Sequence, residues 1–301
     1  MMRRLDDLMR AGLVFLTFLF PATRLFSEDG SAVKPVKILY YTRSVSAQHP
    51  PVIIEADGES VSDKRLKKWG AENGMVFVCT KDGTVFDGDL TPFDGFAFYS
   101  AGDLDAEVSL DGSPPMSKEG KARLLEAVKN GKGFVGFHAT SDSWRDVNHP
   151  PFENQESIDP FLEMLGGEFF LHGEMQDAKM LISNPVDIPW LKDKGEFFTA
   201  FDEWYCLKNF NKDIHVILTQ DTTTMRNECY DRPPYPATWA RLHGKGRVAY
   251  TSLGHGNETW EDDGVIQFFG ELISWSVGRF DIDLTPNMEQ VTPGAAILLN
   301  R

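Results

Sequence analysis

Short apolar runs separated by polar segments dominate the first half of the chain. Four runs rich in β-branched or aromatic residues predict buried strands at 37–42 (KILYYT), 75–80 (MVFVCT), 94–100 (DGFAFYS) and 133–138 (GFVGFH). Amphipathic segments at 64–74 and 118–130 predict helices, capped by Ser62 or Asp63 and by Ser117. The order β-α-β-β-α-β with continuously apolar strands predicts an α/β fold with a mostly parallel central sheet covered on both faces.

The second half of the chain is richer in strand patterns. Further strands are predicted at 168–172, 178–183, 196–207 and 214–220. Residues 236–255 predict a hairpin that turns at HGKG, and 262–278 predict an amphipathic helix capped by Asp262 or Asp263. We therefore expect one domain over 36–279 and a C-terminal tail over 280–301.

The N-terminus has the pattern of a targeting segment. Arg3, Arg4 and Arg10 precede the apolar run AGLVFLTFLFPA at 11–22, which is short for a membrane span. Residues 1–30 therefore predict a signal peptide and a periplasmic or secreted protein, with an uncleaved membrane anchor as the competing interpretation. No later stretch is long and apolar enough to predict a membrane span.

Composition narrows the range of partners. The 301 residues are 42% hydrophobic and 12% aromatic, which is typical of a folded protein. A formal net charge of −15 disfavours nucleic acid and anionic membranes as partners, and is compatible with a neutral substrate or a cation. The three cysteines, Cys79, Cys206 and Cys229, are too few for a disulfide framework.

Candidate chemistry gathers where predicted strands end. His138 follows GFVGF, His172 ends EFFLH, Asp202 and Glu203 interrupt an aromatic strand, and His255 ends the hairpin segment. Ligands of open α/β sheets bind beyond the carboxyl ends of the strands, so these side chains from distant segments predict one shared site. The competing interpretation is that each histidine is an ordinary structural residue.

Two chemistries use such a set. His138, His172, Glu203 and His255 would suit a divalent metal such as Zn²⁺, although no short histidine spacing typical of a metal site is present. The alternative is metal-free acid–base catalysis by His138 and His255, with Asp142 or Asp202 as orienting or proton-transferring partners. Both remain open at the level of sequence.

The segment GFVGFHATSDSW has the form of a nucleophile elbow, because a short strand ends in Gly-x-His before small residues. It carries neither serine nor cysteine at the tip, which disfavours nucleophilic catalysis. Aromatic residues lie near the predicted site, and Trp144, Trp204, Tyr205 and Trp260 are candidates for stacking on a sugar, with burial in the core as the alternative.

Four segments in order, GKGFVGFHATSDSW, LGGEFFLH, FDEWYCL and PATWARLHGKGRVAYTSLGH, resemble the signatures of the trehalose-utilisation (ThuA-like) family over residues 36–279. The resemblance implies a flavodoxin-like sandwich similar to class I glutamine amidotransferases. By this resemblance the His138 region takes the place of the amidotransferase elbow and His255 that of the late histidine. The chain keeps that histidine but lacks the cysteine, so thiol-dependent amidotransferase activity is not expected. The family implies an exported enzyme acting on trehalose-like disaccharides or keto-glycosides; a non-catalytic carbohydrate-binding module is the alternative.

Overall fold

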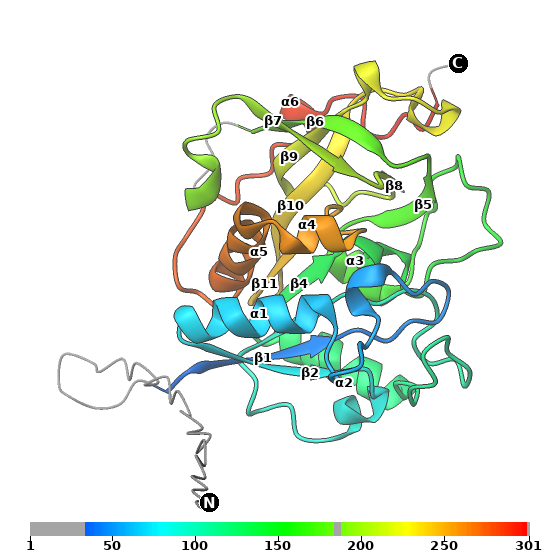
Figure 1. Cartoon of the computed structure of the whole chain (residues 1–301). Helices are drawn as coiled ribbons and strands as arrows, with labels where there is room; N and C mark the ends of the chain where they lie inside the picture. The colour runs from blue at the N-terminus through cyan, green and yellow to red at the C-terminus, as the bar shows by residue number, and fades with distance from the viewer. Residues whose placement is uncertain (1–33, 184–187, 300–301) are drawn as a thin grey trace, which may run out of the picture. The chain divides into compact units, whose positions relative to one another are not determined.

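A nine-stranded sheet forms the centre of the protein, in the order β2-β1-β3-β4-β11-β10-β9-β6-β7 (Figure 1). The computed structural model describes residues 34–183 and 188–299. One half of the sheet is parallel and consists of β1 (Val36–Tyr41), β2 (Met75–Thr80), β3 (Gly95–Phe98), β4 (Gly133–Phe137) and β11 (Gly246–Thr251). The predicted α/β class and the parallel arrangement of the first half are confirmed.

The second half extends the sheet in antiparallel fashion. It consists of β10 (Tyr235–His243), β9 (His215–Asp221), β6 (Gln176–Ile182) and β7 (Phe197–Asp202). A separate two-stranded sheet pairs β5 (Glu168–His172) with β8 (Tyr205–Lys208). Glycine at 244, with a φ of +62°, forms the predicted turn between β10 and β11.

The prediction of a single strand over 196–207 is wrong, because the structure has two strands there. The chain leaves the ladder at Glu203 and Trp204, so that β7 and β8 belong to different sheets. The break has a local cause, because the backbone N–H of Glu203 donates to the side chain of Asp202 at 2.9 Å instead of to a neighbouring strand. This break places Glu203 in the two-residue connection between β7 and β8.

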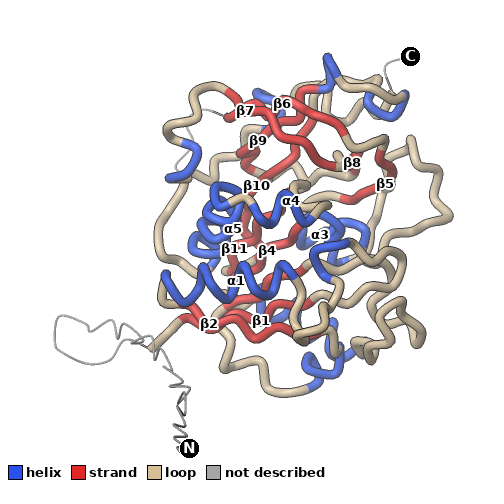
Figure 2. The backbone as a smooth tube through the Cα atoms, in the orientation of Figure 1, coloured by secondary structure: helices blue, strands red, loops and turns tan. Residues whose placement is uncertain are grey.

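Helices cover both faces of the sheet (Figure 2). They are α1 (Val61–Glu72), α2 (Lys118–Lys129), α3 (Pro160–Leu165), α4 (Asn257–Glu261), α5 (Asp263–Ser276) and α6 (Met288–Val291). Successive residues of β1 point to opposite faces, so Ile38 joins a core with α1 and α5 and Leu39 joins another with α2 and α3. Burial on both faces explains why the parallel strands are continuously apolar.

The predicted caps are confirmed for two helices and displaced for one. Ser117 caps α2 and Asp262 caps α5. α1 begins three residues before the predicted start, because Ser60 is its cap and forms a reciprocal capping box with Asp63. Single 3₁₀ turns lie at η1 (Pro50–Val52), η2 (Gly83–Asp87), η3 (His138–Asp142), η4 (Pro189–Leu191), η5 (Thr222–Thr224) and η6 (Glu228–Tyr230).

The segment after residue 279 has little regular structure, yet it packs against the antiparallel half of the sheet. Asn287 accepts the backbone N–H of Val216 at 2.6 Å, and the carbonyl of Ala295 accepts from the buried Arg232 guanidinium at 2.7 Å. The predicted leader at 1–30 lies outside the described residues. Within 34–183 and 188–299, no helix combines the length and apolar character needed to cross a membrane.

Candidate functional site

Five polar side chains from separate segments meet at one edge of the parallel sheet. His49 lies in the loop after β1, His138 directly follows β4, and His255 lies just beyond β11. His172 ends β5, and Glu203 follows β7. Because β1, β4 and β11 are mutually parallel through the sheet, their carboxyl ends share an edge, which explains why residues so distant in sequence converge.

His138 sits on a left-handed backbone turn with a φ of +39°, an unusual conformation for a residue other than glycine. The elbow inferred from the sequence is therefore present with an imidazole at its tip. A side chain on Gly136 would bring a Cβ to 2.9 Å from carbons of both Leu165 and Thr140, which explains the glycine. The hydroxyl of Tyr250 donates to the His138 carbonyl at 2.8 Å and helps to fix this turn.

The tautomer of His138 follows from its hydrogen bond. Its Nδ1 lies 2.7 Å from the carbonyl oxygen of Ser252, which can only accept, so a neutral ring carries its proton on Nδ1. Nε2 then bears a lone pair, is fully buried, and has no hydrogen-bond partner. It lies 3.6 Å from Glu203 Oε2, so two electron-rich atoms face each other unless a cation or proton lies between them.

Glu203 is the centre of the group. Its Oε2 lies 3.1 Å from His255 Nδ1 and its Oε1 lies 3.2 Å from His172 Nδ1. Burial would raise the pKa of Glu203, but the neighbouring His138 and His255 outweigh it and hold this pKa well below its usual value. Burial likewise opposes protonation of His255, yet the Glu203 carboxylate raises the pKa of that ring above 6.5.

His49 belongs to the same group and was not among the residues singled out in the sequence. Its ring centroid lies 4.9 Å from that of His138 and 5.1 Å from that of His255, and its Nε2 lies 3.2 Å from the hydroxyl of Tyr205. Burial first, and then the neighbouring histidines, lower the pKa of His49 to about 2, so the ring is neutral at ordinary pH. The one feature of the sequence that could have indicated His49 is its place in the loop after a predicted parallel strand, where ligands of such sheets bind.

One ligand atom from each of His49, His138, Glu203 and His255 lies within 4.8 Å of the others. Three imidazoles and a carboxylate form a donor set that suits a borderline divalent ion such as Zn²⁺. The buried Nε2 of His138, which has no hydrogen-bond partner, fits the same interpretation, because a bond to a metal would satisfy it. His172, expected among the ligands, lies outside this set and contacts the other oxygen of Glu203, with 44% of its side chain exposed.

Asp202 lies beneath the site and faces backbone groups. It is fully buried, and its two oxygens accept from the N–H groups of Glu203, Gly254 and His255 at 2.7–3.0 Å. Burial raises the pKa of Asp202, although the nearby His138 and these hydrogen bonds oppose the rise. Its geometry is that of a positioning residue, which orients the segment carrying His255 relative to Glu203.

A cavity of about 470 Å³ opens over the cluster. Its polar wall includes Asp142, which accepts from Ser46 Oγ at 2.5 Å and pairs with Arg145. The rings of Phe169 and Tyr205 also line it, and Tyr205 is the one predicted sugar-stacking residue that does so. This volume lies within the range of small-molecule sites, about 300–1,000 Å³.

The other three predicted stacking residues are part of the core, so their assignment to the ligand site is corrected. Trp204 and Trp260 are completely buried, and their indole N–H groups donate to the carbonyls of Gln176 and Gly254. Trp144 is 8% exposed, packs edge-on against Phe161, and donates to Asp105. None of these rings lines the cavity over the histidines in the described part of the chain.

Comparisons with known proteins agree with this fold. The profile of the trehalose utilisation family (ThuA) matches residues 51–276, while no curated protein sequence matches the chain significantly. The fold is similar to that of a ThuA-like protein from Bacteroides uniformis ATCC 8492, with a TM-score of 0.59 and 21% identity over 85% of this chain and 97% of that one. A ThuA-like protein from Parabacteroides merdae ATCC 43184 has a TM-score of 0.55 and 20% identity over 89% and 98%.

The matched region includes four of the five residues of the cluster. The fifth, His49, lies just before the first matched residue. It spans well over half of the 301 residues, and the family supports a carbohydrate-related role in general terms. By this match the chain belongs to the trehalose-utilisation (ThuA) family.

Proposed function

We propose that this protein is a metal-dependent enzyme that acts on a sugar or keto-glycoside, with His49, His138, Glu203 and His255 holding a divalent ion. The observation that carries the proposal is the convergence of their four ligand atoms within 4.8 Å, with the buried Nε2 of His138 left unpartnered. When bound, such an ion would supply a Lewis acid able to polarise a substrate oxygen.

His172 is the proposed proton-transfer group. Its Nδ1 lies 2.9 Å from the carbonyl oxygen of Gly173 and close to Glu203, so this nitrogen is the one that carries the proton in the neutral ring. Nε2 is then free to take a proton, and the partly exposed ring lines the cavity. A histidine base beside a polarised carbonyl is the arrangement needed to remove a proton from the carbon next to the keto group of a sugar.

The cavity wall supports a neutral, hydroxyl-rich substrate. Asp142 offers acceptor oxygens, Arg145 and Gln48 offer donors, and Phe169 and Tyr205 offer apolar faces. Arg145 pairs with Asp142 in this wall, so its guanidinium is not a free cation for an anionic ligand. The three cysteines lie in the described part of the chain, and none of them lines this cavity.

Export of the protein is part of the proposal. It is supported by the basic and apolar pattern of residues 3–22, which lie outside the described residues.

The test is turnover of trehalose and of 3-keto-trehalose, followed by NMR, with protein loaded with Zn²⁺ or Mn²⁺. We expect one of these sugars to be converted, activity to fall to background on chelation or in Glu203→Gln, and His243→Gln to behave as wild type. His243 is a suitable control because it pairs with Gly246 at the start of β11, whereas the proposed ligand His255 follows the end of that strand. Turnover that survives chelation would contradict the metal, and binding without turnover would favour a carbohydrate-binding module.

A further inference from the structure

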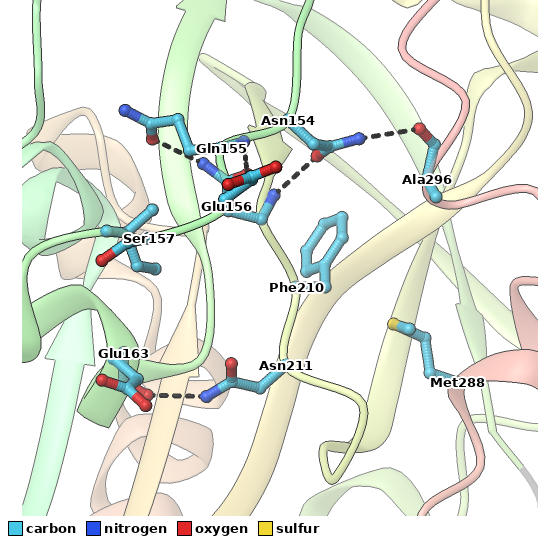
Figure 3. Close-up of a pocket in the computed structure, with 11 residues that line it drawn as sticks. Asn154, Gln155, Glu156, Ser157, Glu163, Phe210, Asn211, Met288 and Ala296 are labelled. Atoms are coloured by element: carbon cyan, nitrogen blue, oxygen red, sulfur yellow. Dashed lines mark hydrogen bonds between the residues drawn. The ribbon is translucent and has the colours of Figure 1, made fainter.

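Figure 3 shows a second polar cavity. Its volume is about 340 Å³, and it shares no lining residue with the cavity over the histidines. It is at the far end of the β5–β8 pair, where Glu168 pairs with Lys208, whereas the histidine site is at the end where His172 pairs with Tyr205. Its walls come from the loop at 154–158, from α3, from the turn after β8 and from the C-terminal segment.

The walls of this cavity are held in place by the side chains that form them. Asn209 has a left-handed backbone with a φ of +54°; its Oδ1 accepts from the backbone of Gln155 at 2.8 Å, while Asn154 Oδ1 accepts from the backbone of Asn209 at 3.1 Å. Asn211 Nδ2 donates to the carbonyl of Glu163 at 2.7 Å. This network fixes the cavity before any ligand binds, which lowers the entropy lost on binding.

Several groups remain available for a ligand. Gln155 uses Oε1 to accept from Asn209, which leaves its Nε2 without a partner within the described residues, and Asn211 Oδ1 is likewise free there. The Glu156 and Glu163 carboxylates, from the 154–158 loop and from α3, also line the cavity and are acceptors. The cavity therefore offers both amide donors and oxygen acceptors.

The ring of Phe210 lies within the same cavity (Figure 3) and provides an apolar face. It packs edge-to-face against Trp239, with ring centroids 5.7 Å apart, so its orientation is fixed by the core. A fixed aromatic face beside planar amides and carboxylates matches the alternating C–H and hydroxyl surfaces of a pyranose ring.

Charge narrows the ligand class further. Among the described residues that line this cavity, none is Lys, Arg or His, while Glu156 and Glu163 are both acidic, so an anionic ligand would be repelled. A metal ion fits poorly, because the side-chain oxygens of Asn154 and Asn209 already accept backbone N–H groups. In 34–183 and 188–299, the one His/Cys/Asp/Glu group with metal-binding spacing is the histidine cluster.

We propose that this cavity is a second, non-catalytic binding site for a neutral mono- or disaccharide, separate from the histidine site. Such a site would hold a sugar whether or not a metal is bound at the histidines. The proposal is therefore tested by measuring sugar binding to metal-free protein.

The experiment is calorimetric and saturation-transfer NMR titration of chelator-treated protein with trehalose, glucose and glucuronate. Gln155→Glu keeps the acceptor for Asn209 but removes the free donor, and Phe210→Leu keeps apolar bulk but removes the flat face. We expect trehalose or glucose to bind, glucuronate to bind more weakly, and each variant to weaken sugar binding about five- to tenfold. His255→Ala should leave this binding unchanged.

Circular dichroism and thermal unfolding establish that each variant is folded, and Glu126→Gln on α2 is the matched surface control. The proposal is overturned if no neutral sugar binds, if glucuronate binds more tightly than glucose, or if binding persists in both cavity variants and disappears in His255→Ala. The last result would place the only sugar site at the histidines and would leave the proposed function intact.

Discussion

The buried carboxylate of Asp202 accepts the backbone N–H of His255 at 3.0 Å. The two residues come from distant segments, because Asp202 ends β7 and His255 follows β11. The same carboxylate accepts from Gly254 and from Glu203. One acidic side chain thus sets the spacing between two proposed metal ligands without facing the cavity.

Replacing Asp202 by Asn tests this positioning role. The amide has one acceptor oxygen in place of two, so its NH₂ group would face an N–H donor, and we expect the variant to lose about 1–3 kcal/mol of unfolding free energy. Metal affinity should fall about 10–100-fold, as for other residues that orient ligands. Denaturant unfolding and metal titration measure both effects. Asp177→Asn is the control, because Asp177 is exposed on β6; equal effects of the two substitutions would refute the role.

The low pKa of His49 predicts a pH dependence of stability. The unfolded chain binds a proton at this ring near pH 6.5, whereas the folded protein binds it near pH 2. Within that window the unfolded state holds more protons, so stability falls as pH falls, by up to about 1.4 kcal/mol per pH unit from this group. We expect the unfolding free energy of metal-free His49→Gln to depend less steeply on pH than that of metal-free wild type between about pH 6 and 5. This range lies above the one in which an unfolded carboxylate titrates.

An identical pH dependence in wild type and His49→Gln would show that His49 is not the buried neutral group.

His172 should separate proton transfer from metal binding. It lies outside the four-ligand group but contacts Glu203, so His172→Ala is expected to keep the metal while turnover falls about 10²–10⁴-fold. Metal analysis and steady-state kinetics on the same preparation are the measurements. Loss of the ion together with activity would instead make His172 a ligand, as the sequence first indicated.

The elbow makes Gly136 sensitive to substitution. In Gly136→Ala the new methyl would lie 2.9 Å from carbons of Leu165 and Thr140, and we expect a loss of about 1–3 kcal/mol in unfolding free energy. Thr140→Ser in the same chain removes one of the two crowded methyls while retaining the hydroxyl, and should recover part of the loss. Full stability of Gly136→Ala would show that the turn does not depend on this close contact.

Much of this architecture could be predicted from the sequence. The apolar runs located β1 to β4, and the strand-end rule placed His138, Glu203 and His255 at one site, because parallel strands bring their carboxyl ends together. The break after Asp202 could not be found from hydrophobicity, because both sides of it are aromatic and the cause is a side chain that takes a backbone N–H.

His49 was missed for a related reason. It lies in a polar loop without strand or helix periodicity, so nothing local distinguishes it from a surface histidine, and its burial depends on contacts with Tyr205 and His138 from distant segments. The tryptophans were misplaced because an indole suits either a sugar site or a core. Their exposure is decided by neighbours such as Phe269 against Trp260, which the chain brings together only on folding.

The most direct test of the account is the metal content and Zn²⁺ affinity of the purified protein and its single variants. We predict about one ion per chain in wild type and in His243→Gln, and its loss in each of His49→Ala, His138→Ala, Glu203→Gln and His255→Ala, with every variant shown to be folded. Wild-type protein that binds no divalent ion, or variants that all retain full occupancy, would contradict the central claim.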